Sequence, residues 1–230
     1  MKPTRIIAVL ALTLVAIPLV RAQDAKPKPA AAPVTPTTAA APAASSAAII
    51  LKQTPSYPLT TCPACAKALP ATPTDYVKDN HLFRLDAATC QKAVDADPAG
   101  VWKKIEVAVI AQQKPTYPLK VSAVSDKALE ATAVDHVYGT RLVRLASADE
   151  VADFEKSPAP AMAKIDKALI EAQLAGYTMK TCPVSKEELG KDGPAVDYLY
   201  GTKLVRFCCK DCIATFEKEP AKYTRTLASK

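Results

Sequence analysis

The sequence predicts an α+β protein made of three tandem small modules, each with a β-hairpin and a helix, joined by longer helices. Three observations predict this arrangement: a repeat with a period of 60 residues, a hairpin pattern inside each copy, and an aromatic content of only 6%. So few aromatic residues in 230 suit several small cores better than one large core. The chain has six glycines and neither phosphate-loop motif, which argues against a large nucleotide-dependent enzyme.

The first 22 residues predict a secretory signal peptide. Lys2 and Arg5 precede an apolar run over residues 6–20, and a cleavage site after Ala22 has Val20 at the −3 position. An uncleaved membrane anchor is the alternative, but a run of about 15 residues is short of the roughly 20 that span a bilayer. We therefore expect an exported protein of the periplasm or cell envelope, with no transmembrane span after cleavage.

Residues 23–48 predict a disordered linker. The segment is almost entirely Ala, Pro, Thr, Ser and a few Lys, so it has little apolar surface to bury against the cost of ordering. Its prolines favour an extended, semi-rigid tether. After removal of residues 1–22, the remaining chain has 27 basic and 23 acidic side chains, a net charge of +4. Because this excess is mild and spread along the chain, we expect no nucleic-acid partner.

The repeat begins at residue 49. Tyr57-Pro58-Leu59 recurs as Tyr117-Pro118-Leu119 and, more loosely, as Tyr177-Thr178-Met179, at a spacing of 60 residues each time. A period of this size predicts tandem modules. We define them as module one (49–113), module two (114–175) and module three (176–230).

Each module has the same predicted order of elements. After the extended Tyr-Pro-Leu segment comes a Cys-Pro corner or its equivalent, then a short polar helix such as residues 185–189. A hairpin follows, clearest as strands 196–200 and 203–207 around Gly201-Thr202. The next helix contains Phe154 or Phe216 and stops at Pro158 or Pro220. In modules one and two a longer amphipathic helix comes next and is expected to connect and brace the modules.

A charged pair recurs in each predicted hairpin. An arginine stands in the second strand of every copy and an aspartate in the first. We expect these residues to pair across the strands rather than to bind a substrate. The pairs are Asp75 with Arg84, Asp135 with Arg144 and Asp197 with Arg206.

The seven cysteines occupy related positions of the repeat. Module three has Cys182, Cys208, Cys209 and Cys212. In module one, Cys62 aligns with Cys182, Cys90 aligns with Cys212, Cys65 stands where module three has Ser185, and Asp86 stands where it has Cys208. Module two has no cysteine, with Ser122, Ala146, Ser147 and Glu150 at the corresponding positions. Since one copy lacks thiols, the cysteines are interpreted as site residues added to a shared scaffold.

The spacing in module three favours a soft-metal site. If a helix begins near Phe207, Cys208 and Cys212 share a face at i and i+4, whereas Cys209 and Cys212 form a C-x2-C pair. Either choice, joined by Cys182, brings three thiolates together across a hairpin. Three or four sulfurs without a nearby histidine favour Cu(I) or Zn(II).

These motifs resemble a known family. Cys182-Pro183-Val184-Ser185, Asp197–Gly201, and Val205–Cys212 with Phe216 together resemble the TRASH/YHS group of heavy-metal-binding modules. The resemblance implies a treble-clef-like fold with Cys182, Cys208 and Cys212 as ligands and Cys209 as an extra thiol. Module one matches in part, through its first and last cysteines, and module two matches only as a scaffold.

The sequence therefore predicts an exported heavy-metal-binding protein that buffers, sequesters or passes on copper or zinc, with another envelope metal-handling protein as a possible partner. Module one, with Cys62, Cys65 and Cys90, is predicted to be a weaker or alternative thiol site. No nucleophile–base pair stands out, so we do not expect an enzyme. The alternative is an envelope scaffold or interaction array in which disulfides staple the modules. A third hypothesis, a thiol–disulfide oxidoreductase, would depend on the C-x-x-C of Cys62 and Cys65.

Overall fold

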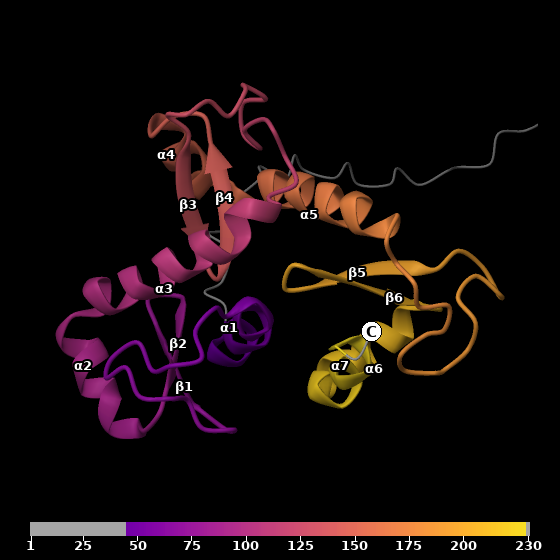
Figure 1. Ribbon diagram of the computed structural model, residues 1–230, viewed down its shortest axis with the longest axis horizontal. Helices are drawn as coiled ribbons and strands as arrows, with labels where there is room; N and C mark the ends of the chain where they lie inside the picture. The colour runs from indigo at the N-terminus through magenta and orange to yellow at the C-terminus, as the bar shows by residue number, and fades with distance from the viewer. Residues whose placement is uncertain (1–44, 229–230) are drawn as a thin grey trace, which may run out of the picture. The chain divides into compact units, whose positions relative to one another are not determined.

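The computed structural model describes residues 45–228, with side chains described as far as residue 224 (Figure 1). The predicted signal peptide and nearly all of the predicted linker lie outside the described residues. Helix α1 begins at Ser46, within the last residues of the segment that we predicted as linker. In the part of the chain that is described, no helix has the length and apolar character needed to cross a membrane.

Three two-stranded antiparallel hairpins confirm the α+β prediction (Figure 1). The third hairpin has the predicted bounds, and in each hairpin all five residues of one strand face partners on the other. The strands are β1 (Thr74–Lys78), β2 (His81–Leu85), β3 (Val134–Tyr138), β4 (Arg141–Leu145), β5 (Val196–Tyr200) and β6 (Lys203–Phe207).

The helices follow the repeat and are divided by prolines. They are α1 (Ser46–Gln53), α2 (Gln91–Ala96), α3 (Pro98–Gln113), α4 (Asp149–Lys156), α5 (Pro158–Leu174), α6 (Lys210–Lys218) and α7 (Pro220–Ala228). Pro98, Pro158 and Pro220 each occupy the first position of a helix, where the missing N–H costs nothing. Each proline therefore separates a short helix from the one that follows it.

The short helix predicted at residues 185–189 is wrong: a turn ends at Ser185, and Glu188 forms an isolated bridge with Thr181. Helix α6 begins at Lys210, so the condition under which Cys208 and Cys212 would share a helix face, a start near Phe207, is not met. The turn follows from a left-handed backbone at Lys186, where φ is 67°, since such a residue interrupts a helix. The third module also has a second helix, α7, which we predicted only for modules one and two.

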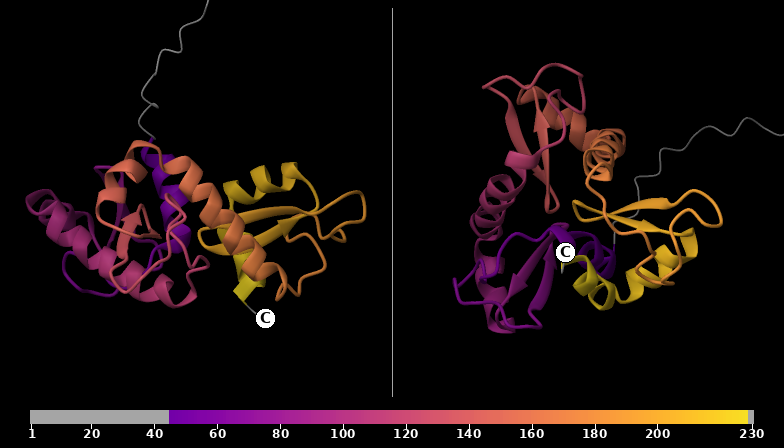
Figure 2. Two further views of the ribbon diagram at one scale, coloured as in Figure 1. Left: turned by 90° about the horizontal axis from the view of Figure 1, so that it is seen from above. Right: turned by 45° about the vertical axis from the view of Figure 1, so that its right-hand side comes forward.

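Each of the helices α1, α3 and α5 packs against the hairpin that follows it in sequence (Figure 2). A glutamine near the end of each helix fixes this contact: its amide nitrogen donates to a carbonyl in the hairpin turn, and its amide oxygen accepts the N–H of a leucine in the second strand. Gln53 bonds Asn80 and Leu82, Gln113 bonds Thr140 and Leu142, and Gln173 bonds Thr202 and Leu204. The glutamines lie 60 residues apart. Gln53 holds the hairpin of its own module, whereas Gln113 and Gln173 join the end of one module to the hairpin of the next.

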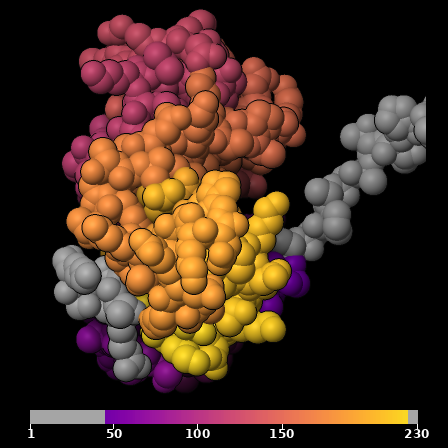
Figure 3. All heavy atoms as spheres, turned by 90° about the vertical axis from the view of Figure 1, so that its right-hand side faces the viewer, coloured from indigo at the N-terminus to yellow at the C-terminus, as the bar shows by residue number. Residues whose placement is uncertain are grey.

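Buried side chains gather in three clusters around the second strands, and the first cluster also includes Val137 and Leu142 of the second hairpin, against which α3 packs. Phe83 and Leu85 pack with α2 and α3, Val143 and Leu145 pack with α4 and α5, and Val205 packs with Phe207 and α6. In Figure 3 module three faces the viewer in light orange and yellow, next to the darker orange atoms of α5. Cys62 belongs to the first core, and Cys182 and Cys212 belong to the third. The candidate ligands thus lie against apolar walls.

The predicted cross-strand pairs are confirmed. Nε of Arg84, Arg144 and Arg206 lies 2.9, 2.8 and 2.6 Å from the paired aspartate oxygen. The backbone N–H of each arginine also donates to a tyrosine hydroxyl of the Tyr-Pro-Leu segment or its counterpart, which are Tyr57, Tyr117 and Tyr177. These bonds tie the segment before the corner to the second strand of its own hairpin.

Candidate metal centre

One backbone corner recurs in all three modules and positions the first candidate ligand. Cys62, Ser122 and Cys182 each donate their N–H to a carbonyl five residues on and accept the N–H of the residue four positions on. Those fourth residues, Ala66, Asp126 and Lys186, all have a left-handed backbone with φ between 62° and 67°. The same corner therefore forms with cysteine or with serine.

Module three brings three sulfurs together. Cys182 comes from the corner, Cys208 directly follows β6, and Cys212 lies in the first turn of α6. Their Sγ atoms all lie within 4.8 Å of one another, and the Cys208 and Cys212 sulfurs are 3.7 Å apart. Zn–S bonds of about 2.3 Å in a tetrahedron separate the sulfurs by about 3.8 Å. The spacing is thus that of sulfurs around one ion.

Cys209 lies beside this cluster. Its Sγ is 3.9 Å from that of Cys208 and 3.6 Å from that of Cys212, but it is not in the mutually close group with Cys182. Its side chain is exposed, at the residue that precedes α6. Both pairings that the sequence left open, Cys208 with Cys212 and Cys209 with Cys212, are therefore close, and the former is the one that Cys182 joins.

The electrostatics of module three favour a thiolate at Cys182. Burial by itself would raise the pKa of this thiol, but the N–H of Cys208 and the hydroxyl and N–H of Ser185 outweigh burial. Together with the N–H of Val184 they lower the Cys182 pKa to about 6. Burial raises the pKa of the Cys212 thiol. A thiolate is the form of cysteine that binds metal, so Cys182 is prepared as the first ligand.

Module one assembles four donor atoms, one more than predicted from its cysteines. Cys62, Cys65 and Cys90 gather with Asp86, with one donor atom of each residue within 4.8 Å of the others. The thiols of Cys65 and Cys90 both donate to Asp86 Oδ1, at 3.0 Å each. These bonds, that from Cys90 first, lower the pKa of the Asp86 carboxyl to about 2. The sequence comparison treated Asp86 as the loss of a thiol, although its alignment with Cys208 was the signal that it belongs to the site.

Module two fills the same place with a carboxylate. Glu150, at the position of Cys212 and only 7% exposed, accepts the hydroxyl of Ser122 at 2.5 Å and the N–H of Ala146 at 3.0 Å on Oε2. Its other oxygen accepts the hydroxyl of Ser125 at 2.5 Å. Burial alone would raise the Glu150 pKa, but these donors lower it. In module two, hydrogen bonds to Glu150 thus take the place of the thiol cluster.

All seven cysteines are unpaired in the structure. The sulfur–sulfur distances among Cys208, Cys209 and Cys212 are between 3.6 and 3.9 Å, compared with about 2.05 Å in a disulfide. Cys182 therefore lies close to Cys208 and Cys212 without a disulfide between them.

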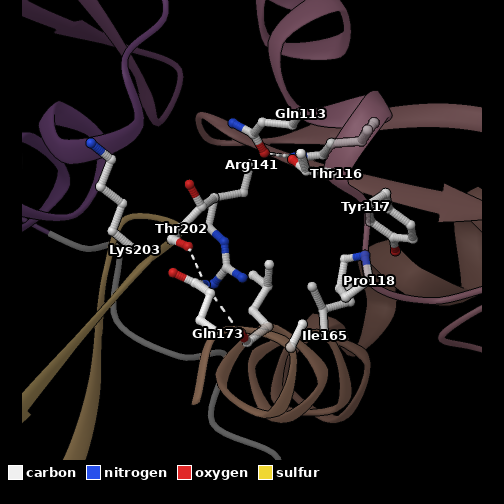
Figure 4. A pocket seen from close by; sticks show the side chains of 12 residues that line it. Gln113, Thr116, Tyr117, Pro118, Arg141, Ile165, Gln173, Thr202 and Lys203 are labelled. Carbon is white, nitrogen blue, oxygen red and sulfur yellow. Dashed lines mark hydrogen bonds between the residues drawn. The ribbon is translucent and has the colours of Figure 1, made fainter. Parts of the chain in front are cut away.

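A cavity of about 420 Å³ lies away from both clusters, between α3, α5 and the hairpins of modules two and three (Figure 4). Figure 4 shows Arg141 and Lys203 on the side opposite Tyr117 and Pro118. No cysteine lines the cavity, and Arg141 is already paired with Asp166 at 2.6 Å. The cavity therefore contributes nothing to a thiolate site.

Comparisons with protein-family models, with curated proteins and with solved structures find no match to this chain. The geometry alone defines the class: a cysteine-rich α+β protein with two clusters that could hold a metal ion.

Proposed function

We propose that the protein binds a soft metal ion, Cu(I) or Zn(II), through Cys182, Cys208 and Cys212 of module three. The observation that carries the proposal is the mutual proximity of the three Sγ atoms, within 4.8 Å. The proposal includes the family that the sequence resembles: we propose that module three is a TRASH/YHS-type metal-binding unit with a treble-clef-like fold. Cys209 serves as an additional thiol beside the three ligands.

The comparison with module two supports a binding role over a structural one. Ser122 forms the same corner without sulfur, and Glu150 closes the position through hydrogen bonds. Because the same corner, hairpin and helix form in module two with Ser122 and Glu150 in these positions, the fold of the repeat does not require cysteine there.

The exposure of the thiols suits delivery as well as storage. Cys182 and Cys212 are buried, Cys208 is half-buried and Cys209 is exposed. An incoming thiolate can therefore approach the ion from the Cys208–Cys209 side while two buried ligands still hold it. We propose a binding protein rather than an enzyme, exported to the cell envelope, which buffers or sequesters the ion or passes it to another envelope protein. Binding releases the thiol protons to solvent.

Elemental analysis of the protein, purified without chelator, tests the proposal. We expect Cys182→Ser and Cys212→Ser each to carry one equivalent of copper or zinc fewer than the parent chain. Thr215→Ala, an exposed change on α6, is the matched control and keeps the full content. A parent protein that is metal-free and takes up neither ion after reduction would overturn the proposal. A thiol count then identifies the stapled-array alternative, which predicts few free thiols.

A further inference from the structure

We propose that Cys62, Cys65, Asp86 and Cys90 of module one form a second site of different selectivity, which prefers Zn(II) over Cu(I) relative to the site in module three. The inference deepens the proposed function but rests on different residues. Its donor set is three sulfurs and one carboxylate oxygen, in contrast to the all-sulfur set of Cys182, Cys208 and Cys212.

Three separate elements supply the four donors. Cys62 and Cys65 come from the corner, Asp86 directly follows β2, and Cys90 ends the single turn before α2. Asp86 Oδ1 lies 3.0 Å from both the Cys65 and the Cys90 sulfur, so these three donor atoms are close enough to bind one ion. Cys62 is 1% exposed and packs in the apolar core of module one, so it is the most buried donor of the group.

The chemistry of these donors favours zinc. Zn(II) is bound in tetrahedral sites by thiolates and by carboxylate oxygens, so four donors complete its coordination. Cu(I) is a softer ion that selects sulfur, and a carboxylate oxygen is a poor substitute for one of its thiolates. Three thiolates and one carboxylate also bring four negative charges together, and a divalent ion attracts each of them twice as strongly as a monovalent ion at the same distance.

Module two argues against a purely structural reading of this group. There Glu150 bridges the hydroxyls of Ser122 and Ser125, the residues that align with Cys62 and Cys65. Hydrogen bonds from two hydroxyls to one carboxylate are therefore sufficient to satisfy the polar side chains at this corner. Thiols are weak hydrogen-bond donors, so replacing both hydroxyls by thiols weakens such a bridge while supplying metal ligands.

The test uses the full chain with Cys182, Cys208, Cys209 and Cys212 all changed to Ser, so that module three has no thiol to bind metal. We call this variant the silent-module chain. The reduced protein is titrated with Zn²⁺ and, separately, with Cu(I), each in competition with a chromophoric chelator. We expect one equivalent of Zn²⁺ to bind. Loss of a residue that only orients a metal ligand typically weakens metal affinity by about 10–100-fold, so Asp86→Asn, which alters a ligand itself, should weaken Zn²⁺ binding by about 10-fold or more.

Two further variants sharpen the test. Asp86→Cys should shift the ratio of Zn²⁺ to Cu(I) affinity toward copper, to the ratio of module three measured in a Cys62→Ser/Cys65→Ser/Cys90→Ser chain. Asp95→Asn changes another carboxylate of the same module, bonded to Tyr76 and Lys78, and should leave the affinity unchanged. Fluorescence of Trp102, the only tryptophan and part of the module one core, reports whether each variant is folded.

The silent-module chain overturns the inference if it is folded and binds no Zn²⁺, if Asp86→Asn binds like its parent, or if Asp86→Cys leaves the ratio unchanged. None of these outcomes affects the proposed function, which is tested by the variants of module three.

Discussion

Modules two and three have the same corner, hairpin and helix, but different side chains fill the space between these elements. In module two the Glu150 carboxylate accepts two serine hydroxyls and one N–H. In module three the corresponding space is bordered by the sulfurs of Cys182, Cys208 and Cys212. The difference teaches that the scaffold does not depend on sulfur, so cysteines at these positions are free to serve a ligand.

Module one is intermediate between the two. It also has a carboxylate, Asp86, but at the position of Ala146 and not of Glu150, and the thiols of Cys65 and Cys90 both donate to it. The three modules thus form a series: hydroxyls with a carboxylate, thiols with a carboxylate, and thiols alone. The backbone corner is unchanged along this series while the donors differ. Glu150 aligns with Cys90 and Cys212, Ala146 aligns with Asp86 and Cys208, and Ser125 aligns with Cys65 and Ser185.

The largest expected effect comes from converting module two into a copy of module three. Ser122→Cys, Ala146→Cys and Glu150→Cys together place thiols at the positions of Cys182, Cys208 and Cys212. Because the corner is the same, we expect the triple variant to bind one more equivalent of copper or zinc than the parent, measured by elemental analysis. The variant Ser122→Cys/Ala146→Cys, which keeps Glu150, is the control and should gain less affinity. A folded triple variant with no added ion would mean that the backbones differ in a way that matters for binding.

The next largest effect is on the stability of module two. Glu150→Ala leaves the Ser122 hydroxyl and the Ala146 N–H without their acceptor, and hydrogen bonds to a charged group contribute about 1.5–3 kcal/mol each. We expect a loss of about 3 kcal/mol in the free energy of local unfolding, read from amide exchange in β3 and β4. Glu155→Ala, at a side chain that is 61% exposed, should change it little.

Acid should reproduce part of this loss. The Glu150 pKa is lowered from its ordinary value of 4.5, so folding favours the ionised form. This contribution is fully present above pH 4.5 and falls as the pH drops through the lowered folded value. The amide exchange of β3 and β4 should therefore accelerate at acid pH in the parent and change less in Glu150→Ala. Equal acceleration in both chains would contradict the assigned role of this carboxylate.

A medium and equal effect is expected where the two modules are alike. Gln113→Ala and Gln173→Ala each remove two hydrogen bonds between a helix and the following hairpin. Leaving such partners unsatisfied costs about 1–3 kcal/mol, so we expect each variant to lose about 2 kcal/mol of stability in denaturant unfolding. A large difference between the two losses would show that the glutamines do not hold the hairpins of modules two and three in an equivalent way.

Much of the fold could be predicted because its signals are local or periodic. The alternation of Val196 to Phe207 around Gly201 fixed one hairpin to the residue, and the period of 60 extended it to the other two copies. The helix predicted at residues 185–189 was wrong because a left-handed residue at Lys186 is decided by the hydrogen bonds of the corner, which no propensity encodes.

The candidate sites also contain residues that the sequence predicted and residues that only the structure assigns. The predicted hairpin and the spacing of Cys182, Cys208 and Cys212 were enough to predict that these thiols converge, and their Sγ atoms lie within 4.8 Å of one another. The roles of Asp86 and Glu150 could not be assigned from residue type, since a carboxylate at a vanished cysteine position reads as a loss of function. Only the distances from Asp86 to two sulfurs and from Glu150 to two hydroxyls show what replaced the missing thiols.

The smallest effect concerns an ion pair that module two has and module three lacks. Lys114 lies 2.6 Å from Asp135, which also pairs with Arg144, whereas among the described residues Asp197 pairs with Arg206 and Leu174 stands at the position of Lys114. The Lys114 side chain is 48% exposed, so Lys114→Met should cost about 0.5 kcal/mol of stability, less in high salt. Leu174→Lys should give module three a similar gain, measured by denaturant unfolding at low and high salt. Because the carboxylate already has its arginine, a loss several times larger would mean that Lys114 helps to position the strand itself.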